Sequence, residues 1–146
     1  MMTIESALVY QSSKLGDVTY TSEDVIRFPQ GIPGFENFRE FLLVTREECD
    51  PFIFLAALEH TDVALPLMPL APSTLSVRPS AAMLAPLAIS GDDTIAYYAV
   101  ASIGLNATQI IVNLRAPIVI NPASMQGIQL LSPESPYELD HPLLRG

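Results

Sequence analysis

The segment FPQGIPGFENF occupies residues 28–38 and combines glycine, proline and phenylalanine in a density found nowhere else in the chain. Gly31 and Gly34 can adopt positive φ at no steric cost. Pro33 fixes its own φ and, standing before Gly34, suits the second position of a type II turn. We therefore expect Gly31, Pro33 and Gly34 to shape a tight turn that buries aromatic side chains beneath a sheet, namely Phe35 and Phe38.

Short apolar segments rich in β-branched and aromatic residues surround this turn. The 13 prolines argue against long helices, because an internal proline removes a hydrogen bond and clashes with the preceding turn. The pattern predicts strands at 15–20, 24–28, 40–45, 51–58, 62–68, 94–103, 108–114, 117–121 and 127–131. Their regular spacing predicts an all-β, mainly antiparallel domain with a small β-barrel-like fold. Only residues 80–87 favour helix, over one or two short turns that end at Pro86.

One of the predicted strands indicates how the sheet is covered. Residues 94–103 are mostly apolar on both faces, which predicts a central strand. Pro117 begins the second of the neighbouring segments 108–114 and 117–121. We expect Asn113, Pro117 and Asn121 to shape this strand junction through turn and strand-end hydrogen bonds rather than to form a binding site.

Length and charge restrict the possible functions. With 146 residues, the chain is expected to be one domain spanning residues 1–146. Its net charge of −9 argues against direct binding to nucleic acid or to anionic membranes, which both require a positive surface. No apolar run reaches the length of a membrane span, and the first residues lack the pattern of a secretory signal. The single cysteine fits a reducing cytoplasm.

The acidic residues are concentrated between Glu36 and Asp62, where seven acids accompany two arginines. Such a run is most often a solvated face that maintains solubility. Alternatively, it forms a surface that docks on a basic protein. On the second interpretation, the candidate contact residues are Glu36, Glu40, Glu59 and Asp62.

Candidate catalytic residues are few. His60 and His141 lie far apart and show no metal-binding spacing, and acids flank Cys49, which disfavours a reactive thiolate. The segment GIPG lacks the spacing and the lysine of a phosphate-binding loop. We therefore expect no enzyme, no cofactor and no metal. A small metal- or thiol-dependent hydrolase using His60, Cys49 or His141 remains the alternative.

Several motifs in a fixed order resemble the flagellar assembly factor FliW family. They are GDVTYTSEDVIRF (16–28), FPQGIPGFENFREFLLV (28–44), PFIFLAAL (51–58), VNLRAPIVIN (112–121) and GIQLLSPESPYELDHPL (127–143). This resemblance implies a cytoplasmic, β-barrel-like protein without catalysis. It also implies two partners: flagellin, bound before export, and the RNA-binding translational repressor CsrA, whose repression of flagellin mRNA is lifted. Flagellin synthesis would thereby be coupled to export.

The chain departs from the family pattern at two places. Leu55-Ala56-Ala57 replaces a leucine–glutamine–serine step, and residues 69–80 carry Arg78 but no acid or aromatic residue. Both changes remove polar or negative groups from a region expected to face partners. A flagellin-specific chaperone without repressor binding is therefore the second hypothesis.

Overall fold

The computed structural model describes residues 7–32, 34–71, 79–103, 109–130 and 141–144, but not the side chains of residues 103, 109–111, 113–115 and 141–144. Its strands are β1 (Leu8–Ser12), β2 (Gly16–Tyr20), β3 (Ile26–Arg27), β4 (Glu40–Thr45), β5 (Ile53–Ala57), β6 (Ala64–Leu70), β7 (Ala96–Ile103), β8 (Gln109–Asn121), β9 (Gln126–Gln129) and β10 (His141–Leu144). Its helical segments are α1 (Ala81–Leu84) and the 3-10 turns η1 (Ser22–Asp24), η2 (Glu47–Cys49) and η4 (Ala85–Leu87). Among the described residues, no helix has the length and apolarity needed to cross a membrane.

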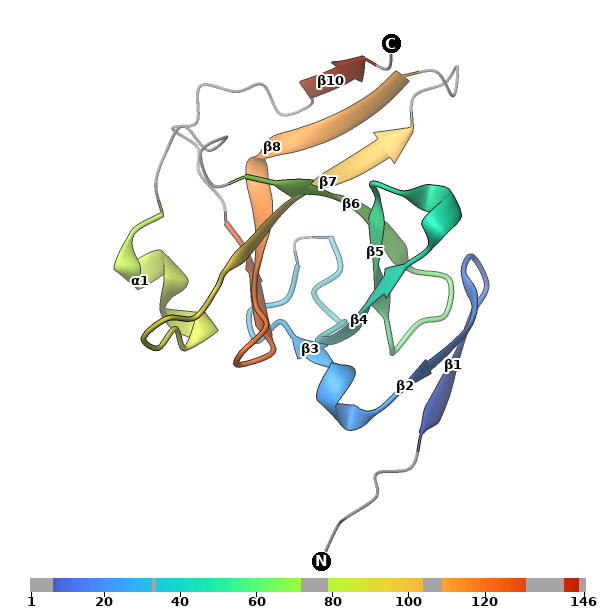
Figure 1. Ribbon diagram of the computed structural model, residues 1–146, viewed down its shortest axis with the longest axis horizontal. Coiled ribbons are helices and arrows are strands. Elements are labelled where there is room, and N and C mark those ends of the chain that lie inside the picture. The colour runs from blue at the N-terminus through green and yellow to red at the C-terminus, as the bar shows by residue number, and fades with distance from the viewer. Residues whose placement is uncertain (1–6, 33, 72–78, 104–108, 131–140, 145–146) are drawn as a thin grey trace, which may run out of the picture.

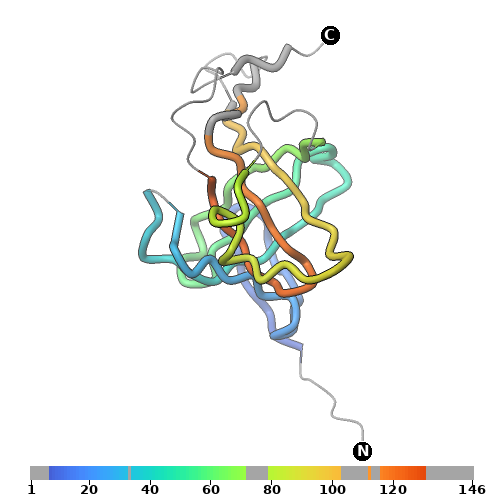
Figure 2. The backbone as a smooth tube through the Cα atoms, turned by 90° about the vertical axis from the view of Figure 1, so that its left-hand side faces the viewer, coloured from blue at the N-terminus to red at the C-terminus, as the bar shows by residue number. Residues whose placement is uncertain are grey.

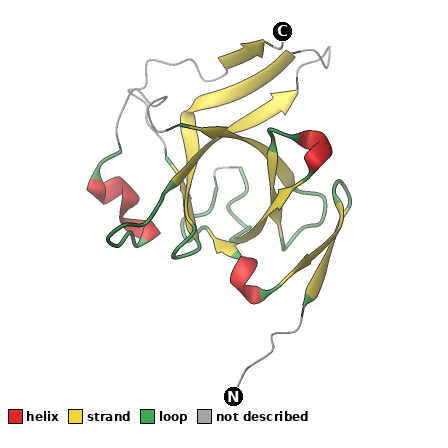
Figure 3. Ribbon diagram, viewed as in Figure 1, coloured by secondary structure: helices red, strands yellow, loops and turns green. Residues whose placement is uncertain are grey.

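The strands from β3 to β9 form a closed barrel (Figures 1 and 3). Neighbouring strands pair in the order β8-β7-β6-β5-β4-β3-β9, and the β8–β9 pairing closes the ring. All pairings are antiparallel except β3–β9, which is parallel and consists of Arg27 opposite Gln126. The prediction of a mainly antiparallel, barrel-like fold is confirmed, and Glu40–Thr45 has the bounds predicted from the sequence.

Strand β8 differs from its prediction, because residues 108–114 and 117–121 belong to one strand rather than two. The register jumps between two pairs: Tyr98 lies opposite Ile118, whereas Val100 lies opposite Asn113. Residues 114–117 therefore form a bulge, at which β8 changes direction in Figure 1. Pro117 is buried within this bulge, where its missing N–H interrupts no regular pairing.

Alternate residues along the strands fill the barrel interior, as the period of two requires. The buried interior residues are Ile26, Phe28, Ile32, Phe41, Leu55, Ala57, Leu67, Ile118 and Ile120. Phe28 and Phe41 meet edge to face, with ring centroids 5.1 Å apart and an interplanar angle of 72°. The remaining strand residues face outward and need separate cover.

The β1–β2 hairpin covers the outer face of β4 and β5 (Figure 1). Tyr10 of β1 is buried there against Leu42, Val44, Ala56 and Ala64. On another side, Leu87 of η4 packs on the outward residues Val119 and Ile128. Strand β1 was not predicted, and its five residues pair only with β2 among the described strands.

The helical segment begins as predicted but ends later. The Ser80 Oγ accepts a hydrogen bond from the Met83 N–H at 3.2 Å, which caps α1. Pro86 does not end the segment, contrary to the prediction, since it lies inside η4. The last turn ends at Ala88, whose φ is 50°. A proline near the start of a helical turn is tolerated because its N–H would be unpaired there.

Tyr10 makes the stability of the folded state depend on pH in the alkaline range. Its hydroxyl donates to the Ala57 carbonyl at 2.8 Å and to the His60 carbonyl at 3.2 Å. Burial, and to a smaller extent the charge of Asp62, raises the pKa of Tyr10 above 10.0. Burial also raises the pKa of Tyr98. The folded state thus favours neutral tyrosine, so this contribution is complete below pH 10 and is lost as the pH rises through the folded-state pKa.

We expect Tyr10→Phe to lower the free energy of unfolding by about 1 kcal/mol at neutral pH, the typical value of one hydrogen bond. The variant should also show a weaker decline in stability above pH 10 than the wild type. Urea unfolding at neutral and alkaline pH measures both quantities. Equal alkaline declines in the two proteins would contradict this role of Tyr10.

Candidate interaction surface

Residues 28–39 leave the barrel between β3 and β4 as a projecting loop (Figure 2). Three successive turns shape it, closed by hydrogen bonds from the Gly31 N–H to the Phe28 carbonyl (2.8 Å), from Phe35 to Ile32 (2.7 Å) and from Phe38 to Phe35 (3.0 Å). Gly31 and Gly34 have φ of 70° and 88°, where side chains are strained. Pro33 lies outside the described residues.

The aromatic residues of the loop are buried to different extents. Phe28 has no exposed surface, whereas Phe35 and Phe38 are only half-buried and stack on each other at 6.3 Å. The expectation that Phe35 and Phe38 are buried beneath the sheet was therefore wrong in degree. Both rings pack against the core cluster from its edge, whereas Phe28 and Ile32 of the same loop are buried within the cluster.

Polar contacts hold the projecting loop in place. The Glu36 carboxylate accepts a hydrogen bond from the Gly34 N–H at 3.0 Å, which lowers the pKa of Glu36. The Arg39 side chain donates to the Glu36 carbonyl at 3.2 Å and also to the Pro29 carbonyl. One guanidinium therefore joins the two ends of the loop.

Substituting Gly34 tests the turn geometry. Because open space surrounds a Cβ at this position, Gly34→Val should cost backbone strain alone, about 1–3 kcal/mol of unfolding free energy. Asn37→Val, in the same exposed loop but without positive φ, is the matched control and should cost less than about 0.5 kcal/mol. Thermal unfolding compares them, and equal melting temperatures would disprove the proposed strain.

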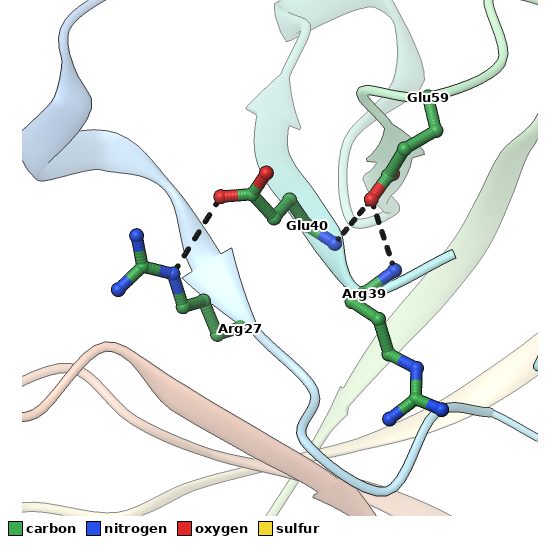
Figure 4. A network of polar contacts seen from close by, with 4 residues as sticks. All are labelled: Arg27, Arg39, Glu40 and Glu59. Carbon is green, nitrogen blue, oxygen red and sulfur yellow. Dashed lines mark hydrogen bonds and ion pairs between the residues drawn. The ribbon is translucent and has the colours of Figure 1, made fainter. Parts of the chain in front are cut away.

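A network of two arginines and two glutamates lies at the base of the loop (Figure 4). Glu59, from the β5–β6 loop, accepts hydrogen bonds from the backbone N–H groups of Arg39 and Glu40, both at 3.1 Å. The Glu40 carboxylate lies 3.5 Å from the Arg27 guanidinium. Both charged side chains of this pair are largely exposed, so the pair contributes little to stability.

The network borders a cavity of about 470 Å³. Its walls come from β3, β4, β9 and the loops beside them: Arg27, Phe28, Pro29, Arg39, Glu40, Glu59 and Gln126. Sites of this size accommodate small molecules or one or two side chains of a partner. We refer to this cavity and the adjoining 28–39 loop as the mixed-charge surface, because it carries both arginines and glutamates.

The structure brings only some of the four candidate contact residues together. Glu40 and Glu59 meet in the network, and Glu36 lies in the adjoining loop. Asp62 instead accepts a hydrogen bond from the Ser13 hydroxyl of the β1–β2 hairpin at 2.5 Å. The mixed-charge surface is not uniformly negative, because Arg27 and Arg39 lie among its acidic residues.

Two of the candidate catalytic residues, Cys49 and His60, lie at opposite ends of β5. Cys49 ends η2 and is half-buried, whereas His60 lies beside Phe38 in the β5–β6 loop and accepts a hydrogen bond from the Asp62 N–H at 3.2 Å. The side chain of His141 lies outside the described residues. Within the described ranges, no three histidine, cysteine or acidic residues are grouped as metal ligands.

The three candidate junction residues have different environments. The side chain of Asn113 lies outside the described residues, and Pro117 is buried in the bulge of β8. Asn121 is fully buried, and its amide donates to the Leu87 carbonyl at 3.0 Å and to the Asp93 carboxylate at 3.1 Å. Asn121 thus ties β8 to η4 and to the loop before β7.

Arg27 and Arg39 were not among the contact residues predicted from the sequence. The available signal was strand pairing: β3 and β4 are antiparallel, and Arg27 lies directly opposite Glu40. Opposite charges at such positions attract each other across a sheet. Recognising the pair would have required predicting the register of a strand only two residues long.

A family model described as "FliW protein" matches residues 9–143. Among relatives called flagellar assembly factor FliW, the protein of Thermotoga neapolitana is 34% identical over 141 residues, covering 92% of this chain and 91% of the relative. The Thermotoga maritima protein is 31% identical over 137 residues, with coverage of 92% and 91%. The Thermosipho africanus protein is 30% identical over 135 residues, with coverage of 90% and 93%.

The fold is also similar to a solved structure. A crystal structure of the flagellar assembly factor FliW superimposes with a TM-score of 0.82 at 28% sequence identity. The match covers 97% of this chain and 99% of the solved one. The similarity to the solved structure therefore extends over almost the whole chain.

Proposed function

The chain belongs to the FliW family, and from this membership we propose that it acts in flagellar assembly as a non-catalytic protein that binds flagellin in the cytoplasm. We propose further that it antagonises a CsrA-type translational repressor, so that flagellin synthesis follows export. The observation that carries the proposal is the family match over residues 9–143, supported by relatives named flagellar assembly factors.

The proposed contact region is the mixed-charge surface, together with Asp62. Its acidic members Glu36, Glu59 and Asp62 are exposed, and Glu40 is partly so. The glycine turns and the Arg39 contacts fix the shape of the 28–39 loop before any partner binds. A preformed surface loses less conformational entropy on binding, which favours affinity.

Calorimetry with purified flagellin tests the proposal directly. We expect a saturable heat of binding, and the absence of both heat and co-elution at about 50 µM would contradict it. The repressor is added in a second titration. On the full proposal it binds as well, and flagellin changes its affinity or displaces it.

The surface is tested with amide variants, because glutamine and asparagine keep the acceptor oxygens that the fold uses. We expect the combined variant Glu36→Gln, Glu40→Gln, Glu59→Gln and Asp62→Asn to associate with flagellin about tenfold more slowly at low salt, with a smaller difference at high salt. The matched control is Glu47→Gln with Glu48→Gln in the exposed turn η2. If the combined variant associates as fast as the wild type at both salt concentrations, the acidic residues are only a solvated face and the proposed contact region is wrong.

A flagellin-specific chaperone without repressor binding is the second candidate. Residues 69–80 favour it, because this segment contains no acidic residue and one arginine, which suits an RNA-binding partner's basic surface poorly. This candidate predicts that the repressor neither binds the chain nor displaces flagellin. The titration with the repressor therefore separates the two candidates.

A further inference from the structure

The β1–β2 hairpin forms a sheet of only two strands, so each strand has an outer edge (Figure 1). Exposed edges are templates for pairing with another chain unless charges, prolines or bulges protect them. The outer edge of β2 contains neither proline nor bulge in its five paired residues. Its one charged side chain, on Asp17, lies at the end of the strand next to the hairpin turn.

The hydrogen bonds of Arg46 reveal which backbone groups of β2 face outward. The Arg46 guanidinium donates to the Leu15 carbonyl at 3.1 Å and lies 3.5 Å from the Asp17 carbonyl. Backbone groups alternate along a strand, so Val18 and Tyr20 pair with β1 and the N–H and C=O of Thr19 point the same way as Asp17. No described residue hydrogen-bonds to the backbone of Thr19 on this outer edge.

A cavity of about 400 Å³ opens beside the same residue. Val18, Thr19 and Tyr20 of β2 line it, and most of the other lining residues are apolar, namely Ile26, Leu42, Leu43, Ile120, Pro122 and Met125. Asp24 also lines the cavity. An unpaired strand edge and an adjoining apolar pocket are the two elements that strand-adding binding sites use, the first for affinity and the second for specificity.

We propose that the outer edge of β2 binds an extended segment of a partner protein, which pairs with the backbone of Thr19 and inserts one large apolar side chain into the 400 Å³ cavity. Charged residues at the two ends of the edge determine which residues of the partner segment are favoured beside the inserted side chain. Glu23 and Asp24 are exposed at the η1 end of the edge, so a basic residue should stand within two positions of the inserted side chain. Arg46 lies at the other end, which disfavours a base there.

The site is independent of the mixed-charge surface. It is formed by β2 and the residues around η1, and its cavity shares no lining residue with the cavity at the base of the 28–39 loop. A partner bound there would therefore leave the mixed-charge surface accessible. Loss of one interaction would not imply loss of the other, so the experiments on the two surfaces can fail separately.

The probe is a panel of synthetic heptapeptides, each with a lysine beside a central valine, leucine, phenylalanine or methionine and with threonine elsewhere. We expect at least one to bind the full chain at or below about 1 mM, as measured by NMR titration, and to slow exchange of the Thr19 amide proton. Replacing the central residue by glycine should weaken binding at least tenfold, since a large apolar side chain is removed. No binding by any peptide at this concentration would overturn the proposal.

Backbone pairing has a distinctive signature in peptide chemistry. N-methylation at each peptide position in turn should weaken binding about tenfold at alternate positions, because only alternate N–H groups face β2. Methylation that weakens binding at every position, or at none, would exclude strand addition. This measurement changes the peptide only and does not depend on the folding of a variant.

A proline substitution tests the protein side. Thr19→Pro removes the outward N–H without removing a bond to β1, a position at which edge strands tolerate proline. We expect peptide affinity to fall about tenfold. Gln11→Pro is the matched control, because Gln11 lies opposite Asp17 and its N–H faces the other edge of the hairpin. It should leave affinity unchanged, and the reverse result would place the site on β1.

A second copy of this chain is the competing occupant. Pairing of two copies through β2 would appear as a concentration-dependent dimer in sedimentation, and Thr19→Pro would dissociate it. That result would overturn the proposal of a partner segment. A monomer that binds the peptides supports it.

Discussion

Replacing Phe28 by alanine is expected to lower the free energy of unfolding by about 3–5 kcal/mol, the range for loss of a buried aromatic ring. Phe28 has no exposed surface and meets Phe41 edge to face. Its ring also lies against the backbone of Gly127, where an added Cβ would come within 2.5 Å of the ring. The ring thus occupies the interior beside the single-pair β3–β9 contact that helps to close the barrel.

Gly127→Ala provides the complementary measurement. Its methyl group would overlap the Phe28 ring, and we expect a loss of about 1–3 kcal/mol. In a background that carries Phe28→Leu, whose side chain is smaller, Gly127→Ala should cost less, because the free-energy changes of substitutions at contacting residues are not additive. Chemical denaturation of the two single variants and the double variant gives the coupling. Strict additivity would show that the two residues do not constrain each other.

Asn121→Asp is expected to lower the free energy of unfolding by about 3–5 kcal/mol at neutral pH, because it leaves an unpaired charge in a buried position. The amide that donates to the Leu87 carbonyl and to Asp93 is replaced by a second carboxylate. Burial and the neighbouring carboxylate raise the pKa of the new group. The penalty should therefore shrink as the pH falls towards the ordinary carboxyl pKa and vanish below it, where this group is protonated in both the folded and the unfolded state.

Ser124→Ala is the matched control for this site. The Ser124 hydroxyl donates to the same Leu87 carbonyl at 2.6 Å but is only half-buried. Its loss should cost about 1 kcal/mol and should not depend on pH. Unfolding in urea at neutral and acidic pH compares the two variants. A pH-independent loss for Asn121→Asp would mean that the new group remains in contact with water.

The sequence predicted local features because their causes lie within a few residues. Gly31 and Gly34 were expected to allow positive φ, and both have it. The bounds of Glu40–Thr45 follow from a short apolar run of β-branched and aromatic residues. Ser80 begins a helical turn because its side chain caps the N–H three residues on.

The candidate interaction surface was only partly predictable. The acids were identified, but their pairing with Arg27 and Arg39 depends on which strands and loops meet in the barrel. The outward groups of Thr19 and the cavity beside them were not anticipated at all, since an unpaired edge exists only relative to the strands that do not cover it. Neither the arginine–glutamate contacts nor the unpaired edge can be predicted from residues that are neighbours in the sequence.

The sequence by itself determined the strand-rich character, the turn-forming glycines and the family to which the chain belongs. Only the tertiary structure decided the closure of the barrel, the joining of two predicted segments into β8 and the choice of Phe28 over Phe35 and Phe38 as the buried ring. The physical reason is range: turn geometry and side-chain alternation act between near neighbours. Closure and burial depend on contacts such as that of Phe28 with Gly127, between residues far apart along the chain.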